Sequence, residues 1–487
     1  MTQENLQPNN AQYKRAIMIL VDGARPDVLT KEIMKGNLPN IQKYFVTKGT
    51  HKTMLTCFPS TTGPAYLPYL TGCFPGTCNI PGVRWFDKIA YAKKGWGFKS
   101  FRSYCGLETR YFDTDMNPNI KTAWDIYSHG KNIIGGVTKG IKEENDKTKK
   151  KRSLYYYYSH LTDRWAFIDQ IASRELVKTI KQKYFDFIFT VFPAVDEYSH
   201  RSSCVHERTL KAYHEFDQHL GKAIQELKDQ DIYDETLIMI FSDHGLSDTH
   251  THFDVGPWLE KEKKISTLYY TNIFKFRFQA STMVSGNGMC HVYLKGENGW
   301  GYRKTFEEIS STSVLLDEFR LRPEVDFVAT QGADNSIHIQ NDKGHSWFSF
   351  NKNTLKLSYF YDNSDPLSLF STDSNTAEHD FSFDDSLKLT WDSPYPDIFM
   401  QLHQLFQTQR TGDIILSARK GFDFRVKFEH PIHKSSHGAL LPEHMRVPLL
   451  MNHQIQTEHI RSVDLFPTML KLTGKKIPEG IDGRCLV

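Results

Sequence analysis

The sequence predicts an α/β protein with a central, mostly parallel sheet, helices on both faces of that sheet, and an inserted α+β cap region. Three continuous apolar runs occupy residues 16–21, 185–192 and 236–241. Such runs are typical of strands that are covered on both faces. Between the second and third runs, apolar residues recur at spacings of three and four from Val205 to Leu227, which predicts an amphipathic helix. Strand, helix and strand in this order indicate a βαβ crossover.

The sequence pattern changes between residues 256 and 404, where aromatic, strand-like segments alternate with polar segments. We therefore predict a core formed by residues 11–255 and 405–487 and an insertion or cap formed by residues 256–404. After the insertion, the strand-like segment 412–418 is expected to return to the core. The segment 461–474 is expected to form a helix that ends at Gly474.

Charge and cysteine usage argue against several classes of protein. The chain has 60 basic and 57 acidic residues, a net charge of +3, so no basic field indicates a nucleic-acid partner. The basic run KTKKKR at 147–152 is expected to be a solvated loop, with an anionic-lipid or nucleic-acid patch as the alternative. Seven scattered cysteines without a C-x-x-C pair predict neither a zinc knuckle nor a disulfide framework.

The N-terminal segment is polar, and the apolar run that follows it spans only residues 16–21. This run is too short for a signal-peptide core or a membrane span. We therefore expect a cytoplasmic protein with no membrane span. The sequence leaves the oligomeric state open.

Acidic and imidazole side chains follow each of the three predicted strands, and another lies near the C-terminus. In open α/β sheets, ligands bind beyond the carboxyl ends of the strands. Mixed carboxylate and imidazole groups suit Zn²⁺, with Mn²⁺ as the alternative. Singly, each Asp is more often a turn or cap residue, and each His a hydrogen-bonded structural residue. Jointly they predict a metal centre formed by Asp22, Asp196, His200, Asp243, His244 and His437.

A candidate nucleophile lies in the segment FPSTTGPAYLPYLTG at residues 58–72. Pro is favoured at the first position of a helix, so a helix is predicted to begin at Gly63-Pro64. Thr62 would then lie at the helix N-terminus, where backbone N–H groups favour an anionic oxygen and a bound phosphate. Simple capping of the helix by Thr62 is the alternative.

Four segments in this order, VDGARPD, FPSTTGPAYLPYLTG, DEYSH with SDHG, and SSHGAL, resemble the alkaline phosphatase superfamily. The closer resemblance is to its type I phosphodiesterase/nucleotide pyrophosphatase family, over residues 15–250 and 412–487. It implies two divalent metal ions. One ion would be held by Asp22, Asp243, His244 and the oxygen of Thr62, and the other by Asp196, His200 and His437, with Asp22 close to both.

The resemblance implies a metal-dependent phosphodiesterase that acts on a small-molecule phosphoester, of nucleotide or lipid-headgroup type, through a phosphothreonine intermediate on Thr62. The sulfatases of the superfamily use a modified Cys or Ser instead. In that superfamily the nucleophile stands nine residues before the Thr of a Thr-Gly pair. The pair Thr71-Gly72 therefore implies, by the resemblance, that Thr62 is the nucleophile, and a Thr cannot become formylglycine.

One departure concerns substrate binding. The nucleotide pyrophosphatase branch usually has Asn three residues after the nucleophile, where Ala65 stands here. We predict that the N–H of Gly63 or the guanidinium of Arg84 contacts the phosphate instead, because Arg suits bidentate phosphate recognition. For Arg84, a surface residue packed by Trp85 is the alternative.

Other functions stay open on the same core. A phosphomonoesterase, a phosphonate hydrolase or a phosphomutase would fit the departure at Ala65. A protein of a different class, which binds metal and phosphate without turnover, is the further alternative.

Overall fold

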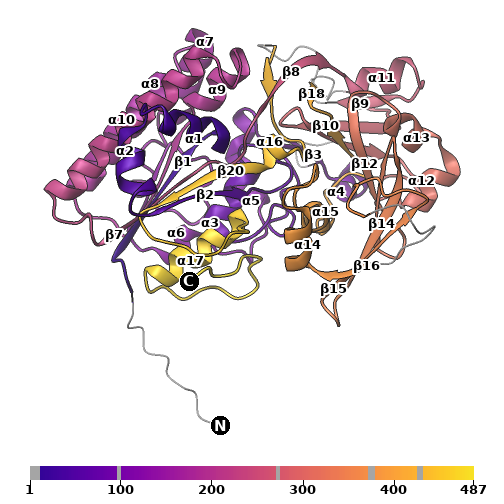
Figure 1. Cartoon of the computed structure of the whole chain (residues 1–487). Coiled ribbons are helices and arrows are strands. Elements are labelled where there is room, and N and C mark those ends of the chain that lie inside the picture. Colours follow the sequence, from indigo (N-terminus) through magenta and orange to yellow (C-terminus); the bar gives the residue numbers. More distant parts are fainter. Residues whose placement is uncertain (1–10, 96–99, 270–274, 371–378, 425–431) are drawn as a thin grey trace.

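Two large sheets organise the chain in the computed structural model, which describes residues 11–95, 100–269, 275–370, 379–424 and 432–487 (Figure 1). The first sheet has six strands. In spatial order they are β2 (Thr50–Leu55), β20 (Arg446–Met451), β7 (Thr236–Phe241), β1 (Arg15–Val21), β6 (Phe187–Phe192) and β5 (Gly130–Ile133). The three central strands coincide with the three predicted apolar runs.

The centre of this sheet is parallel. β1 pairs in parallel with β6 and β7, and β5 pairs in parallel with β6, whereas β20 and β2 are added antiparallel. In the register, Val21 lies opposite Phe192 and Leu20 lies opposite Phe241. The carboxyl ends of β1, β6 and β7 therefore meet at one edge, and the predicted mostly parallel sheet is confirmed.

Helices cover both faces of the six-stranded sheet, which is why every residue from Ala16 to Val21 is buried. Figure 1 shows α1 (Pro26–Met34), α8 (Ala166–Lys181) and α10 (Glu207–Asp229) on one face, and α3 (Leu67–Thr71) and α17 (Leu465–Leu472) on the other. α10 is the helix expected from Val205 to Leu227, and α17 lies within the segment expected to be helical. Helices α7 (Arg152–Thr162) and α9 (Ala194–Arg201) lie beside α8.

The second sheet has nine strands. In spatial order they are β16 (His379–Ser382), β15 (Lys356–Asp362), β14 (Gly344–Asn351), β13 (Ile337–Asn341), β12 (Val325–Gln331), β17 (Ile414–Ala418), β11 (Met289–Leu294), β10 (Ala280–Ser285) and β9 (Thr267–Tyr269). Its two faces pack separate cores. Phe327 and Ala329 face α15 (Ile398–Phe406), whereas Val328 faces α11 (Val255–Lys261) and α13 (Leu315–Arg320).

β17 corrects one expectation. The segment 412–418 was expected to return to the core, but β17 lies between β12 and β11 in the nine-stranded sheet. An apolar strand fits the middle of either sheet, so composition alone does not decide its partners. The domain limits at residues 255/256 and 404/405 stay a prediction.

The remaining elements are short. The helices are α2 (Pro39–Ile41), α4 (Lys88–Lys94), α5 (Phe112–Asp115), α6 (Ala123–Ile126), α12 (Phe306–Thr312), α14 (Phe383–Thr390) and α16 (Pro442–Met445). β3 (Arg84–Phe86) pairs with β4 (Phe101–Ser103). β8 (Ser247–His252) pairs with β18 (Gly421–Asp423) and β19 (Ser435–Ser436). Within the described ranges, no helix has the length and apolar character needed to cross a membrane.

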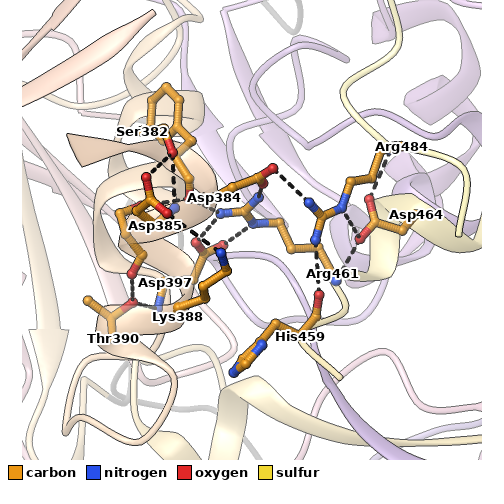
Figure 2. A network of polar contacts seen from close by, with 12 residues as sticks. Ser382, Asp384, Asp385, Lys388, Thr390, Asp397, His459, Arg461, Asp464 and Arg484 are labelled. Carbon is orange, nitrogen blue, oxygen red and sulfur yellow. Dashed lines mark hydrogen bonds and ion pairs between the residues drawn. The ribbon is translucent and has the colours of Figure 1, made fainter. Parts of the chain in front are cut away.

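A polar network joins the two halves of the molecule (Figure 2). Arg461, which precedes α17, donates to both carboxylate oxygens of Asp397, at 2.8 Å from Nε to Oδ2 and 2.6 Å from Nη2 to Oδ1. It also donates to the carbonyl oxygen of Phe383, the first residue of α14. Arg484 near the C-terminus reaches Asp384 at 2.7 Å. The closing segment of the chain is thereby tied to the helices that cover the nine-stranded sheet.

Candidate metal centre

The predicted ligands converge because the strands that precede them end together. Asp22 directly follows β1, and Asp243 with His244 lies just beyond β7. α9 begins two residues after β6 and carries Asp196 and His200, which at a spacing of four share one helix face. All five side chains are therefore delivered to the same edge of the sheet.

His437 comes from the far end of the chain. β19 pairs antiparallel with β8, with Ser436 opposite Ser247, and this pairing carries the next residue back to the edge where β7 ends. The imidazole rings of His437 and His244 stack, with centroids 3.7 Å apart and an interplanar angle of 13°. The structure thus brings together all six predicted ligands.

Thr62 lies inside the same cluster. Its Oγ1 is 3.0 Å from Nε2 of His244 and 3.4 Å from Oδ1 of Asp22. The helix expected after it begins with a 3₁₀ turn at Pro64 and continues as α3. Gly63 has a φ of +93°, in the left-handed region that favours glycine.

The cluster contains two sets of closely spaced ligand atoms, each set within 4.8 Å: Asp196, His200 and His437, and Asp22, Asp196 and His244. The first set matches the second metal site implied by the resemblance. In the other set, Asp196 takes the place given to Asp243. Oδ2 of Asp243 nevertheless lies 3.4 Å from Nε2 of His244. The division of ligands between two ions stays a prediction.

All three carboxylates are buried, and two of them have oxygens without a hydrogen-bond partner. Asp22, Asp196 and Asp243 are 3%, 5% and 0% exposed. Among the described residues, neither carboxylate oxygen of Asp243 has a hydrogen-bond partner, and neither does Oδ1 of Asp196. A buried carboxylate without a partner is strongly destabilising unless a cation balances it. This pattern fits a site for divalent cations.

The three imidazoles are oriented for coordination. Nδ1 of His200, His437 and His244 lies at 2.7, 3.0 and 3.2 Å from the carbonyl oxygens of Ser435, Ser60 and Gly245. A carbonyl accepts only, so each Nδ1 donates, and Nε2 is the ring nitrogen left for a metal ion once any proton on it is displaced. Metal-binding histidines in proteins have this arrangement.

Burial and mutual charge shift the pKa values of the ligands. Burial, and then the charges of Asp243 and Asp196, raise the pKa of Asp22 well above its usual value. Burial also raises the pKa of Asp243. For His200, burial lowers the pKa, but the charge and hydrogen bond of Asp196, the charge of Glu197 and the hydrogen bond to Ser435 together outweigh burial and raise the pKa to about 9. Metal binding would displace these protons.

Tyr66 is a contact that the sequence analysis did not assign. Its hydroxyl donates to Oδ2 of Asp22 at 3.0 Å, and the side chain is buried. Tyr66 stands four residues after Thr62, one helical turn along, so the spacing could have suggested it. The ring of His433 also stacks on His200, with centroids 4.1 Å apart.

The two predicted phosphate contacts differ in their surroundings. The N–H groups of Thr62 and Gly63 donate to no described residue, which leaves them available to a ligand. Arg84 is only 6% exposed, so the alternative of a surface residue is wrong. Its guanidinium donates to Oγ of Ser103 and to the carbonyl oxygen of Val284, on a strand that ends next to His437. A role in substrate binding stays a prediction for Gly63 and Arg84.

Ala65 is buried with Cys57, Phe74 and Val463 in a small apolar cluster. Its side chain is therefore directed among apolar neighbours. A polar amide at this position would have to be accommodated within that cluster.

The parallel sheet and the ligand cluster at its carboxyl edge define a hydrolase of the alkaline phosphatase superfamily. A family model described as type I phosphodiesterase/nucleotide pyrophosphatase matches residues 16–440. The chain belongs to this family of metal-dependent enzymes, which act on phosphoester bonds. The predicted resemblance is confirmed.

Solved structures share the fold. Murine ectonucleotide pyrophosphatase/phosphodiesterase 5 gives a TM-score of 0.56 at 13% identity, over 95% of this chain and 96% of that chain. An inactive form of the murine protein in complex with AMP gives a TM-score of 0.56 at 13% identity, over 96% of each chain. Phosphonoacetate hydrolase from Sinorhizobium meliloti 1021, in complex with phosphonoformate, gives a TM-score of 0.57 at 14% identity, over 95% of this chain and 96% of that chain. A comparison with curated proteins gave no match.

Proposed function

We propose that the chain hydrolyses small-molecule phosphodiesters and pyrophosphates through a phosphothreonine intermediate on Thr62. The observation that supports this is the position of the Thr62 hydroxyl, 3.0 Å from His244 and 3.4 Å from Asp22 within the ligand cluster. Two divalent cations, which we propose are Zn²⁺ with Mn²⁺ as the alternative, would lower the pKa of a bound hydroxyl and neutralise charge on the phosphoryl oxygens.

The seven predicted side chains divide into two roles. Thr62 is the nucleophile, and its oxygen would also be a ligand of one ion. The ligands, divided between the ions as the resemblance implies, are Asp22, Asp243, His244, Asp196, His200 and His437.

The reaction takes two displacements. Oγ1 of Thr62 attacks phosphorus, the bond from phosphorus to the leaving oxygen breaks, and the alcohol of a diester, or the phosphate group of a pyrophosphate, leaves with the proton of Thr62. Water then attacks the phosphothreonine from the opposite side, and the Thr62 hydroxyl is restored as phosphate or its monoester leaves. We propose that the N–H groups of Thr62 and Gly63, which donate to no described residue, bind a phosphoryl oxygen during both steps.

The test compares Thr62→Ala with Thr62→Ser. The alanine variant lacks the attacking oxygen, so its kcat on bis-p-nitrophenyl phosphate should fall by roughly a thousandfold or more. The serine variant keeps the hydroxyl and should retain most activity. Metal content, measured by elemental analysis, should be largely retained in both. Full activity in Thr62→Ala would remove the proposed nucleophile.

A substrate panel tests the substrate class. We propose a nucleotide-type or lipid-headgroup phosphoester, and the AMP bound to the murine structure supports the first. Phosphonate hydrolysis is the second candidate, supported by the similarity to phosphonoacetate hydrolase. Bis-p-nitrophenyl phosphate, p-nitrophenyl phosphate and phosphonoacetate separate these activities. Two metal ions per chain without turnover of any ester would instead indicate a binding protein.

We also propose a cytoplasmic location. All seven cysteines lie in described parts of the chain and are free thiols, as a reducing compartment requires. Recovery of the protein in a membrane-enclosed or secreted fraction with oxidised thiols would contradict this.

A further inference from the structure

Helix α7 presents an apolar stripe to solvent. Leu154, Tyr157, Tyr158 and Leu161 follow the spacing i, i+3, i+4 and i+7, which places them on one helix face. Their exposed fractions are 65%, 53%, 36% and 82%. Tyr156, on the other side of the helix, packs against the core of the six-stranded sheet. Tyr158 borders the covered side, because its ring packs against Phe167 of α8. Leu154, Tyr157 and Leu161 are therefore the part of the stripe that the protein leaves uncovered.

A group of exposed lysines precedes this helix. Lys149, Lys150 and Lys151 are all exposed. Nζ of Lys149 lies 3.7 Å from Glu143, whereas Lys150 and Lys151 form no ion pair with any residue that the structure describes. The N-terminus of a helix carries a partial positive charge, which disfavours lysines there. A negatively charged partner would offset this repulsion.

Helix α7 contacts a helix that carries proposed metal ligands. Arg201, the last residue of α9, donates to the carbonyl oxygen of His160 on α7 at 3.3 Å. The same short helix α9 carries two proposed ligands, Asp196 and His200. Figure 1 shows α7, α8 and α9 side by side at the edge of the sheet. A partner bound to α7 would therefore contact a helix that neighbours α9.

We propose that α7 and the lysines before it form a docking surface for an anionic lipid bilayer. The helix lies in the plane of the interface, with its Leu and Tyr side chains in the headgroup region and the lysines against anionic headgroups. Tyr is a favoured residue at this boundary. The contact is peripheral, because α7, with 11 residues, is too short to span a bilayer.

The size of the surface argues against a second copy of the chain as the partner. A helix of 11 residues is about 16 Å long and 10 Å wide. A stable dimer buries about 800 Å² per partner, which such a strip does not supply. A bilayer needs no matching surface, and it supplies both the apolar medium and the negative charge.

The first measurement is co-sedimentation of the full chain with vesicles. The protein should bind vesicles that contain phosphatidylcholine and phosphatidylserine. It should bind vesicles of phosphatidylcholine alone at least about tenfold more weakly. Added salt should weaken the binding, because screening shortens the reach of the lysines. Equal binding to both vesicles, or to neither, would overturn the proposal.

Two paired variants test the two parts of the surface. Leu154→Glu combined with Leu161→Glu should abolish binding. Lys150→Gln combined with Lys151→Gln should weaken it by about thirtyfold. The matched controls are Met34→Glu, at a side chain that is 82% exposed on α1, and Lys93→Gln combined with Lys94→Gln. Binding should not change in the controls, and an equal loss there would overturn the assignment to α7.

Two further readouts separate this proposal from others. Turnover of a soluble ester should be unchanged in all four variants, so a failure of lipid binding is distinct from a failure of the proposed hydrolysis. Analytical ultracentrifugation reports self-association. A dimer that dissociates in the leucine variant, without any vesicle binding, would show that a second copy covers the stripe.

Discussion

Tyr66 connects the helix after the nucleophile to the ligand cluster at the scale of single residues. Its hydroxyl is bonded to one oxygen of Asp22, and the other oxygen of Asp22 faces Thr62 and His244. Groups that orient a metal ligand in this way hold it in one rotamer and preserve its basicity. Tyr66 is therefore a positioning residue for Asp22.

The replacement Tyr66→Phe tests this role. Loss of the hydrogen bond should lower metal affinity or kcat by about 10- to 100-fold, with little change in KM. Competition with a chromogenic chelator measures the affinity.

Tyr69→Phe is the matched control, because Tyr69 is on the same helix and its buried hydroxyl donates to a backbone carbonyl, that of Ser242, at 2.6 Å. A similar loss of metal affinity in both variants would show a general effect on the helix rather than a specific contact with Asp22.

Local sequence predicted the convergence of five ligands because they follow three strands with clear apolar runs, whereas His437 follows the polar strand β19. It did not predict the burial of Arg84. That burial depends on Val284, which lies two hundred positions further along the chain on β10. It also left Tyr66 without a role, since a tyrosine at this spacing is equally suited to simple packing.

Strands β13 and β14 carry a chain of hydrogen bonds at the scale of secondary-structure elements. Nδ1 of His338 and Nε2 of His345 are 3.0 Å apart, and Nδ1 of His345 lies 2.8 Å from Oδ2 of Asp362. Phe306 stacks on His338, with centroids 4.0 Å apart. Burial, and then the charge of His345, lower the pKa of His338 to about 4. A neutral His338 is thus part of the folded sheet.

This lowered pKa predicts a loss of stability in acid. The unfolded chain protonates His338 near its ordinary pKa of about 6.5, whereas the folded chain does so only near 4. The stabilisation is therefore complete above pH 6.5 and is lost as the pH falls toward 4, by about 2–3 kcal/mol. His338→Gln should reduce the slope of unfolding free energy against pH in this window by up to about 1.4 kcal/mol per pH unit.

Urea unfolding at several pH values measures this slope. His345→Gln removes the charge that is the second cause of the lowered pKa of His338, so it should reduce the slope less than His338→Gln does. An unchanged slope in His338→Gln would show that the acid sensitivity lies in other histidines.

The sheet to which a strand belongs was less predictable than the strand itself. β17 has the same apolar character as β1, and its burial on both faces is equally complete. Its partners, β11 and β12, are separated from it by more than eighty residues. Sheet membership is decided by such distant pairings, and these leave no mark in the local pattern.

At the scale of the whole molecule, Arg461 couples the closing segment of the chain to the helices that cover the nine-stranded sheet. Arg461 is 6% exposed and Asp397 is 0% exposed. The pair is bidentate, and Arg461 also satisfies the carbonyl oxygen of Phe383 (Figure 2). Removing one member of a buried pair leaves the other charge without a partner, which is strongly destabilising.

We therefore expect Arg461→Ala to lower the free energy of unfolding by about 3–5 kcal/mol. The matched control is Arg484→Ala in the same network, where the Arg484 and Asp384 side chains are 43% and 53% exposed. Solvent screens that pair, so its loss should change stability by at most about 1 kcal/mol. Urea unfolding followed by tryptophan fluorescence and by circular dichroism measures the stability of both variants.

Equal effects of the two variants would show that the network does not join the two halves of the molecule through Arg461. A large effect confined to Arg461→Ala, with coincident transitions by both probes, would show that the two sheets unfold as one unit.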